Sequence, residues 1–332
     1  MSSQDRAAAL SAGAAPRIEY RHVSPGEPLP RDLLAAVVFG RDAPGAHDAR
    51  TIRVGLEPLG GPAPAELWHA SGPVRTGEEG PIRFSSDEAH LVGCLEMDER
   101  ACGGLAGAAR AAYETIRRFQ ERSTHAHLLR MWNYFDAINH GADDAERYRQ
   151  FCLGRAQGLG SGIADYPAAS AIGRRDGEPT LQIYWLAGRT AGRALENPRQ
   201  LAAYRYPRQY GPAAPSFSRA MLLPGPLLLI SGTASIIGHA SHHPENLAAQ
   251  LDETLANLAS VRQRAAMLSP GLRNRFGPET LLKVYLRRPE LAVELRTQLA
   301  ERLPRKASWL LLQADICREE LLLEIDCAHG AG

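Results

Sequence analysis

The spacing of apolar residues predicts strands and helices in alternation through the first half of the chain. Over residues 104–122, apolar side chains recur at steps of three and four, which predicts an amphipathic helix. Asp143 or Asp144 is suited to cap a second helix that reaches about Gly158, because acidic residues favour a helix N-terminus. The strands predicted for this half are residues 50–59, 66–70, 90–97, 128–135 and 181–187.

The second half repeats this order of elements. A long helix is predicted at 244–268 and a shorter one at 289–303, with a proline in its first turn. Aligning LLRMW at Leu128 with LLKVY at Leu281 superimposes a strand-strand-helix-strand-helix-strand pattern twice. The sequence therefore predicts an α+β fold of two similar halves, each a sheet backed by helices. The strands predicted to close the second half are 281–286, 307–314 and 320–325.

The stretch 196–241 contains two apolar runs, 216–223 and 227–237, on either side of Pro224-Gly225-Pro226. Proline and glycine at these positions favour a tight turn, so a hairpin is predicted. It places Arg219 on the first strand, opposite a run of small residues on the second. An arginine facing small residues suits a site for a small carboxylated molecule. The same pattern also fits a buried hairpin whose arginine reaches solvent.

Composition narrows the class of protein. The 332 residues suffice for one large or two medium domains, and the net charge of +1 has no Lys/Arg run of the kind that marks nucleic-acid or membrane binding. Asp5 and Arg6 stand where a signal peptide needs an apolar core, and the longest apolar run is too short for a spanning helix. A cytoplasmic protein is therefore expected. Five scattered cysteines, without a CxxC, are typical of reduced thiols. They are Cys94, Cys102, Cys152, Cys317 and Cys327.

Several motifs occur in order from about Met131 to the C-terminus and together resemble the chorismatase and 3-hydroxybenzoate synthase family. They are YRQFCLGRAQGL (148–159), YPAASAIG (166–173), ENPRQLAAYRYPRQYGPAAPSFSRAM (196–221), SGTASIIGHAS (231–241) and ADICREELLLEID (314–326). This resemblance implies two tandem RidA/YjgF-like domains in a pseudo-trimer-like arrangement, with the pocket in the cleft between them. The boundaries expected are a partly flexible lead at 1–45, an N-terminal domain at 46–190, a C-terminal domain at 191–327 with most of the site, and a tail at 328–332.

The implied substrate is chorismate, which carries two carboxylates and an enol ether whose cleavage releases pyruvate. Carboxylates call for arginine, and hydroxyl groups of tyrosine fix orientation. Tyr148 and Arg155 are seven residues apart on one predicted helix, so both are expected on one face. No metal or cofactor is implied. The binding residues that the resemblance implies are Tyr148, Arg155, Tyr206, Tyr210 and Arg219, with Gly232 and Thr233 lining the pocket.

Two residues near the C-terminus are the catalytic candidates. Glu324 interrupts the apolar run LLLEID, where burial would raise its pKa and keep a proton available for the enol ether. Cys317 lies seven residues earlier, a spacing that resembles the family's product-steering cysteine and catalytic glutamate. The other four cysteines are predicted to be core residues.

Some alternatives stay open at the level of sequence. The product is 3-hydroxybenzoate, alone or with 4-hydroxybenzoate, unless the enzyme simply hydrolyses chorismate to a dihydroxycyclohexadiene carboxylate. A non-catalytic RidA-like metabolite-binding protein would keep the arginines but has no use for a buried acid. Family members vary a small residue near GHAS, for which Ala240 is chosen and Ala234 is the other candidate. A monomer or a homotrimer is expected.

Overall fold

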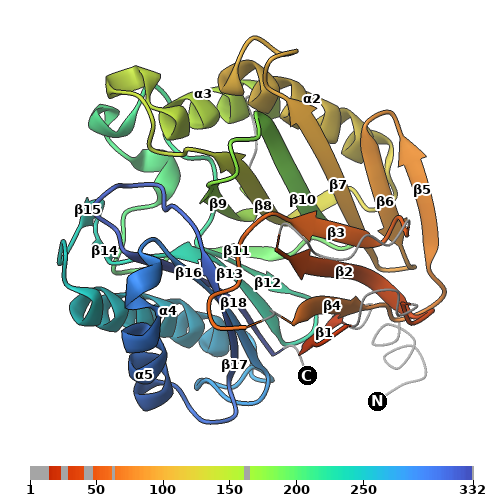
Figure 1. Ribbon diagram of the computed structural model, residues 1–332. Helices are drawn as coiled ribbons and strands as arrows, with labels where there is room; N and C mark the ends of the chain where they lie inside the picture. The colour runs from red at the N-terminus through yellow and green to blue at the C-terminus, as the bar shows by residue number, and fades with distance from the viewer. Residues whose placement is uncertain (1–14, 24–28, 41–47, 62–63, 161–164, 331–332) are drawn as a thin grey trace.

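The structure is a computed structural model, and it describes residues 15–23, 29–40, 48–61, 64–160 and 165–330. Three large sheets enclose a common centre, and helix pairs cover the outer faces of two of them (Figure 1). The first sheet has the strand order β1-β4-β2-β3. Its strands are β1 (Arg17–Arg21), β2 (Leu33–Phe39), β3 (Thr51–Val54) and β4 (Ala65–His69).

Part of the predicted lead is thus folded. Both β1 and β2 lie between residues 15 and 40 and pair with β4, whereas residues 1–14, 24–28 and 41–45 of the lead fall outside the described residues. The strand β2 was not predicted because nearly all of it is buried, so its apolar run shows no alternation with polar residues. The strand predicted at 50–59 is shorter, although Pro58 still makes a bridge to Leu312 of the second half.

The first half forms a six-stranded sheet of order β5-β6-β7-β10-β8-β9. The strands β8 and β9 are parallel, and β10 lies antiparallel between β7 and β8. The sequence missed the hairpin β5–β6 and the strand β9. The elements are β5 (Arg75–Glu79), β6 (Ile82–Ser86), β7 (His90–Asp98), α2 (Leu105–Arg122), β8 (His127–Asp136), η1 (Asp143–Ala145), α3 (Arg147–Leu159), β9 (Ala168–Arg174) and β10 (Thr180–Gly188).

The second half has the same strand order, β11-β12-β13-β18-β16-β17, and the same parallel pair at one edge. The predicted repeat is therefore confirmed, with β8 and β16 as the matching strands. Its elements are β11 (Arg193–Leu195), η2 (Ala203–Arg205), η3 (Arg208–Tyr210), β12 (Ala220–Leu223), β13 (Leu227–Thr233), β14 (Ile236–Ile237), β15 (Ala240–Ser241), α4 (Leu247–Leu268), β16 (Thr280–Leu286), η4 (Pro289–Leu291), α5 (Ala292–Arg302), β17 (Ser308–Gln313) and β18 (Leu323–His329).

The hairpin around Pro224-Gly225-Pro226 is confirmed, with corrected bounds. The first strand, β12, begins only at Ala220, because residues 216–219 leave the sheet and meet the first half, where Ser218 bridges to Ala168. The second, β13, ends at Thr233, after which β14 and β15 form a separate small hairpin. The last strand was predicted at 320–325, but it runs over Leu323–His329 because the exposed Glu319 and Glu320 belong to the preceding turn.

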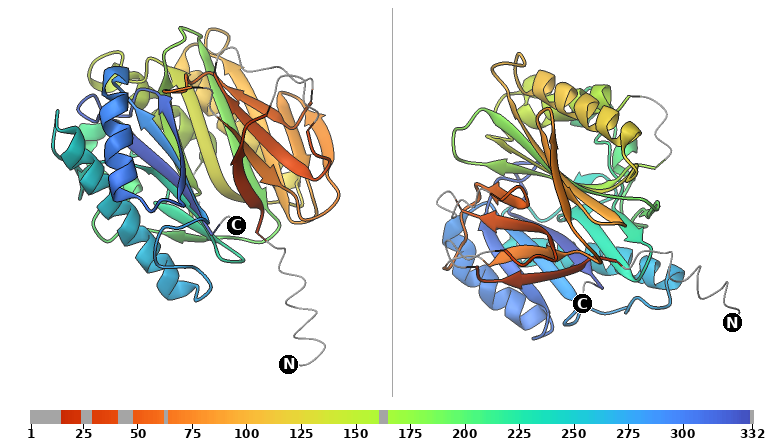
Figure 2. Two further views of the ribbon diagram at one scale, coloured as in Figure 1. Left: turned by 60° about the horizontal axis from the view of Figure 1, so that its bottom comes forward. Right: turned by 90° about the vertical axis from the view of Figure 1, so that its right-hand side faces the viewer.

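The core has three layers of apolar contact. One cluster lies at the centre, where all three sheets contribute side chains such as Leu34, Trp132 and Tyr285. A second lies between the first-half sheet and α2 and α3, and a third between the second-half sheet and α4 and α5 (Figure 2). The two halves are therefore held together by their sheets, and their helices face outward. The domain boundaries proposed from sequence stay predictions.

Candidate active site

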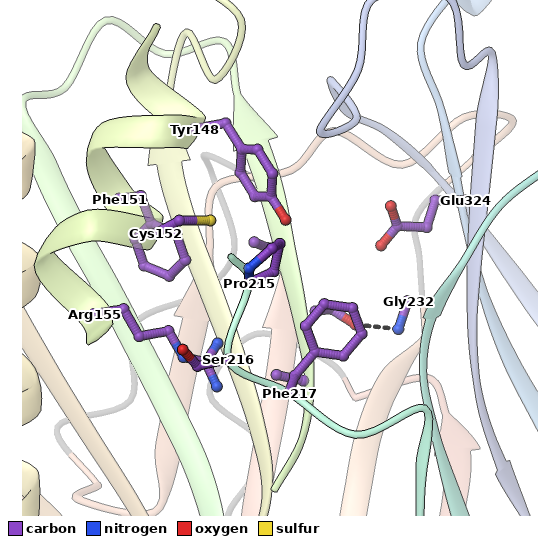
Figure 3. A pocket seen from close by; sticks show the side chains of 12 residues that line it. Tyr148, Phe151, Cys152, Arg155, Pro215, Ser216, Phe217, Gly232 and Glu324 are labelled. Atoms are coloured by element: carbon purple, nitrogen blue, oxygen red, sulfur yellow. Dashed lines mark hydrogen bonds between the residues drawn. The ribbon is translucent and has the colours of Figure 1, made fainter. Parts of the chain in front are cut away.

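A pocket lies where the two halves meet. Its empty volume, including the part open to solvent, is about 400 Å³. The first half contributes α3 and β9, and the second contributes residues 215–217, β13 and β18 (Figure 3). The lining residues are Tyr148, Phe151, Cys152, Arg155, Ala169, Ser170, Ala171, Pro215, Ser216, Phe217, Gly232 and Glu324.

One face of α3 points into this pocket because the other face is pressed against α2. A side chain at Gly154 would come within 2.1 Å of the Ala106 carbonyl oxygen, so only glycine allows the two helices to pack this closely. Tyr148 and Arg155 both project from α3 to the pocket, as their spacing predicts. Burial raises the pKa of the Tyr148 phenol well above its ordinary value, so the hydroxyl remains a hydrogen-bond donor.

The surroundings of the Arg155 side chain suit the binding of an anion. Its side chain lies over the Tyr113 ring, 4.9 Å from the ring centre, and the residue is only 3% exposed. Within the described part of the chain, its Nε and Nη2 atoms have no hydrogen-bond partner. A buried guanidinium with free donors is costly unless a ligand supplies the acceptors. A carboxylate in the pocket would do so.

Arg219 supplies a second cation behind Phe217. Its Nη2 donates to the Tyr206 hydroxyl at 2.8 Å and to the Leu201 carbonyl oxygen at 2.9 Å. Its Nε is buried and has no partner among the described residues. The two predicted binding residues Arg219 and Tyr206 therefore contact each other, but neither is among the residues that line the pocket.

A bulge in β13 brings the backbone of Gly232 to the pocket floor. The register with β18 shifts between Ile230 and Thr233, and the Gly232 amide donates instead to Ser170 Oγ at 3.0 Å (Figure 3). A methyl group on Gly232 would stand 1.8 Å from Glu324 Oε1, so this position requires glycine. Thr233 differs from its predicted use, because its hydroxyl donates to the Ser231 carbonyl oxygen at 2.8 Å.

Glu324 lies on the central strand β18, between β13 and β16, and is 5% exposed. None of the hydrogen bonds within the described residues reaches its carboxyl group. Burial, and then the charge of Asp326, raise its pKa from 4.5 to about 8, against the opposing effect of Arg130 and Arg219. The carboxyl group therefore carries a proton at neutral pH and faces the pocket as an acid.

Cys317 packs against apolar clusters of both halves, next to Tyr148 in one and Ala234 in the other. Burial, with the charge of Glu324, raises the pKa of its thiol to about 12, so the group is a neutral thiol at physiological pH. Of the two small residues considered from sequence, Ala234 shares a cluster with Cys317, whereas Ala240 lies on β15, paired with Ile237.

Tyr210 belongs to a neighbouring cluster that the sequence did not reveal. Its hydroxyl lies 3.1 Å from His239 Nδ1, and the Arg318 guanidinium lies 4.1 Å from the centre of its ring. Arg318 also donates to the His239 carbonyl oxygen and to Ser241 Oγ, which ties the β14–β15 hairpin to the segment after β17. The Tyr206 ring packs at a tilt against that of Tyr210, with 5.3 Å between the ring centres, and Tyr206 connects this cluster to Arg219.

Sequence reasoning also missed part of the pocket wall. Ser170, Pro215, Ser216 and Phe217 lie within the quoted motifs, but their residue types alone carry no signal of a site. Cys152 was predicted as a core residue. It is buried, yet it lines the pocket, and burial raises the pKa of its thiol to about 12.

Two further observations concern the described part of the chain. It contains no group of three His, Cys, Asp or Glu side chains placed to hold a metal ion. None of its helices is both long and apolar enough to cross a membrane.

Comparison with known proteins places this geometry in a family. Residues 66–187 match the family model described as chorismatase FkbO/Hyg5-like, N-terminal. The chain is 38% identical over 274 residues to a chorismatase of Streptomyces rapamycinicus, which covers 79% of this chain and 81% of that protein. It is 34% identical over 276 residues to a 3-hydroxybenzoate synthase of Streptomyces hygroscopicus, covering 79% of this chain and 80% of that protein.

The fold agrees with these relationships. A crystal structure of a chorismatase superimposes with a TM-score of 0.83 at 32% identity, covering 95% of this chain and 98% of the other. The expected architecture, an α+β fold of two tandem halves, is therefore confirmed both by the repeated strand order and by this neighbour. With two curated relatives above 30% identity over most of its length, the chain belongs to the chorismatase family of enzymes.

Proposed function

We propose that this enzyme cleaves the enol ether of chorismate, releasing pyruvate and forming 3-hydroxybenzoate, alone or with 4-hydroxybenzoate. The observation that carries the proposal is a buried, protonated carboxyl group, Glu324, in a pocket whose Arg155 has unpaired donors. An acid and a carboxylate-binding cation are the two groups that this reaction needs. The names of the relatives, chorismatase and 3-hydroxybenzoate synthase, point to the same substrate.

In this proposal Glu324 is the general acid. Transfer of its proton to the methylene carbon of the enol ether creates a cation stabilised by the ether oxygen. The bond between the ether oxygen and the ring carbon then breaks, and the three-carbon fragment leaves as pyruvate with the ether oxygen as its keto oxygen. The ring cation that remains loses a ring proton and becomes aromatic, and for 3-hydroxybenzoate the ring hydroxyl first moves to the neighbouring carbon. Chorismate has the same atoms as pyruvate plus a hydroxybenzoate, so aromatisation needs no external oxidant. Plain hydrolysis takes up one water instead and leaves the ring as a diene.

Arg155, Arg219 and Tyr206 hold the substrate in this proposal. Arg155 offers free donors to one carboxylate from α3, and Arg219, held by Tyr206 behind Phe217, has a free Nε for the other. Tyr148 orients the substrate through its hydroxyl. Cys317, as a neutral thiol beside Glu324, steers the fate of the ring and does not take part in proton transfer to the enol ether.

The test is incubation of the purified enzyme with chorismate. Pyruvate is measured through lactate dehydrogenase and NADH oxidation, and the ring products are separated by chromatography. Glu324→Gln keeps the shape of the side chain and removes the proton, so turnover should fall at least about a hundredfold. Pyruvate with a diene diol in place of hydroxybenzoate would establish plain hydrolysis. Binding of chorismate without release of pyruvate would establish a binding protein and refute the proposal.

A further inference from the structure

A buried cluster of charged side chains lies directly behind the pocket, at the centre of the three sheets. Two cations and two anions form it, each less than 5% exposed: Arg130, Lys283, Glu66 and Asp326. They come from β8, β16, β4 and β18, so each sheet contributes at least one. Lys283 Nζ lies 3.2 Å from Glu66 Oε2 and 3.8 Å from Asp326 Oδ1. The cluster lines a second, smaller cavity and is balanced in charge.

The hydrogen bonds of Asp326 identify its form. Its Oδ2 receives the Trp132 indole at 3.1 Å, the Tyr285 hydroxyl at 2.8 Å and the Ser170 hydroxyl at 3.2 Å. Arg130 Nη2 lies 3.3 Å from the same oxygen. Indole and guanidinium nitrogens can only donate, so this oxygen must accept. Asp326 thus lies among hydrogen-bond donors and two cations, which are the partners that hold a carboxylate in place.

Asp326 and Glu324 are two residues apart on one strand, so both side chains point to the same face of β18. The repeat of a strand puts them roughly 7 Å apart. The Ser170 hydroxyl stands between the pocket and Asp326. It accepts from Arg130 Nη2 at 2.6 Å and from the Gly232 amide at 3.0 Å while it donates to Asp326. Its hydrogen-bonding capacity is thus fully used.

The other groups around Glu324 do not supply a negative charge. The helix α3 contributes Tyr148, Cys152 and Arg155. The other groups are Arg130 on β8, Arg219 before β12, Tyr285 on β16 and Cys317 after β17. Among the residues that the structure describes, Asp326 is the only carboxyl group that acts on Glu324. Without it, only burial would oppose the nearby arginines, and the pKa of Glu324 would be lower.

We propose that Asp326 is a positioning residue of this active site, whose fixed negative charge keeps the proton on Glu324. Arg130, Lys283, Tyr285, Trp132 and Ser170 hold that charge behind the pocket, where it does not meet the substrate. The inference rests on the proposed role of Glu324 as the acid, but it concerns the protonation of Glu324 and is measurable without turnover.

The experiment follows the protonated carboxyl group of Glu324 by its infrared carbonyl band, identified by its loss in Glu324→Gln. In the wild type, the pH at which half of this band has disappeared gives the ionisation midpoint. Asp326→Asn should lower the midpoint by between about one and two pH units, as expected for one charge at this distance in a protein interior. The alkaline limb of the kcat profile should move by the same amount.

Two variants act as controls. Glu66→Gln removes a carboxylate from the same cluster, but on the far side of Lys283, and should move the midpoint by much less than Asp326→Asn. Ser170→Ala removes a hydrogen bond to Asp326 while leaving its charge, and should also leave the midpoint near that of the wild type. A large shift in either control would mean that packing, and not the charge of Asp326, sets the midpoint.

Removing one buried charge can unfold a protein, so a second variant keeps the test decisive. Asp326→Asn combined with Lys283→Met removes one charge of each sign and leaves Arg130 balanced by Glu66. Its midpoint should also fall. A midpoint equal to that of the wild type in the folded variant would overturn the inference. If the wild type does not consume chorismate, the infrared titration still decides the role of Asp326, so the two failures are distinguishable.

Discussion

The buried carboxyl group of Glu324 should make the protein less stable as the pH rises. In the folded state the pKa is raised to about 8, whereas in the unfolded chain the group ionises near 4.5. Between these values the folded protein holds a proton that the unfolded chain has released. The stabilisation is therefore fully present below pH 4.5 and is lost as the pH rises through 8. Glutamine at this position has no proton to lose and should show none of this dependence.

The size of the effect follows from the two pKa values. For each pH unit between the two pKa values, the free energy of unfolding of the wild type falls by about 1.4 kcal/mol relative to Glu324→Gln. Over the whole interval of about 3.5 units the loss is about 5 kcal/mol. Contributions from other titrating groups cancel in the difference between the two proteins. The variant should thus gain stability relative to the wild type on going from pH 4.5 to pH 8, even though it loses turnover.

Urea unfolding at several pH values, followed by circular dichroism, measures this difference. Glu320→Gln is a matched control, because Glu320 is an exposed glutamate four residues away. The difference in the free energy of unfolding between this variant and the wild type should not change with pH. A constant difference between Glu324→Gln and the wild type across this pH range would refute the argument. It would mean that Glu324 is ionised in the folded protein and cannot be the acid.

Four further substitutions test the pocket. Arg155→Ala and Arg219→Ala should each lower kcat/KM by an amount equivalent to about 2–5 kcal/mol, because a buried carboxylate of the substrate loses its partner. Wild-type kcat/KM in both variants would show that the carboxylates bind elsewhere. Gly232→Ala should abolish most turnover by displacing the Glu324 carboxyl group, whereas Gly72→Ala, where no atom lies within 4 Å of the added methyl, should not. Cys317→Ala should keep chorismate consumption and change the ratio of ring products on chromatography; an unchanged ratio would make Cys317 an ordinary core residue.

The sequence by itself determined the elements whose signal is local. The helices α2 and α4 were visible because their apolar residues recur with the period of a helix that is buried on one side. The turn at Pro224-Gly225-Pro226 was visible because the dihedral angles of proline and glycine restrict the chain whatever surrounds it. The order of these elements was enough to reveal the repeat, and the motifs carried the family. Glu324 was found because a lone carboxyl group in an apolar run is itself a local anomaly.

Only the tertiary structure decided which partners these residues meet. The strand β2 was not predicted, although its neighbours β3 and β4 were, because burial on both faces removes the alternation of apolar and polar residues. That burial is supplied by strands distant in sequence. The unpaired donors of Arg155 and the bulge at Gly232 likewise depend on contacts between the two halves. Asp326 reads in sequence as one more acidic residue after Glu324. Its charge matters because β8, β9 and β16 bring donors to it from as far as Trp132, 194 residues away along the chain.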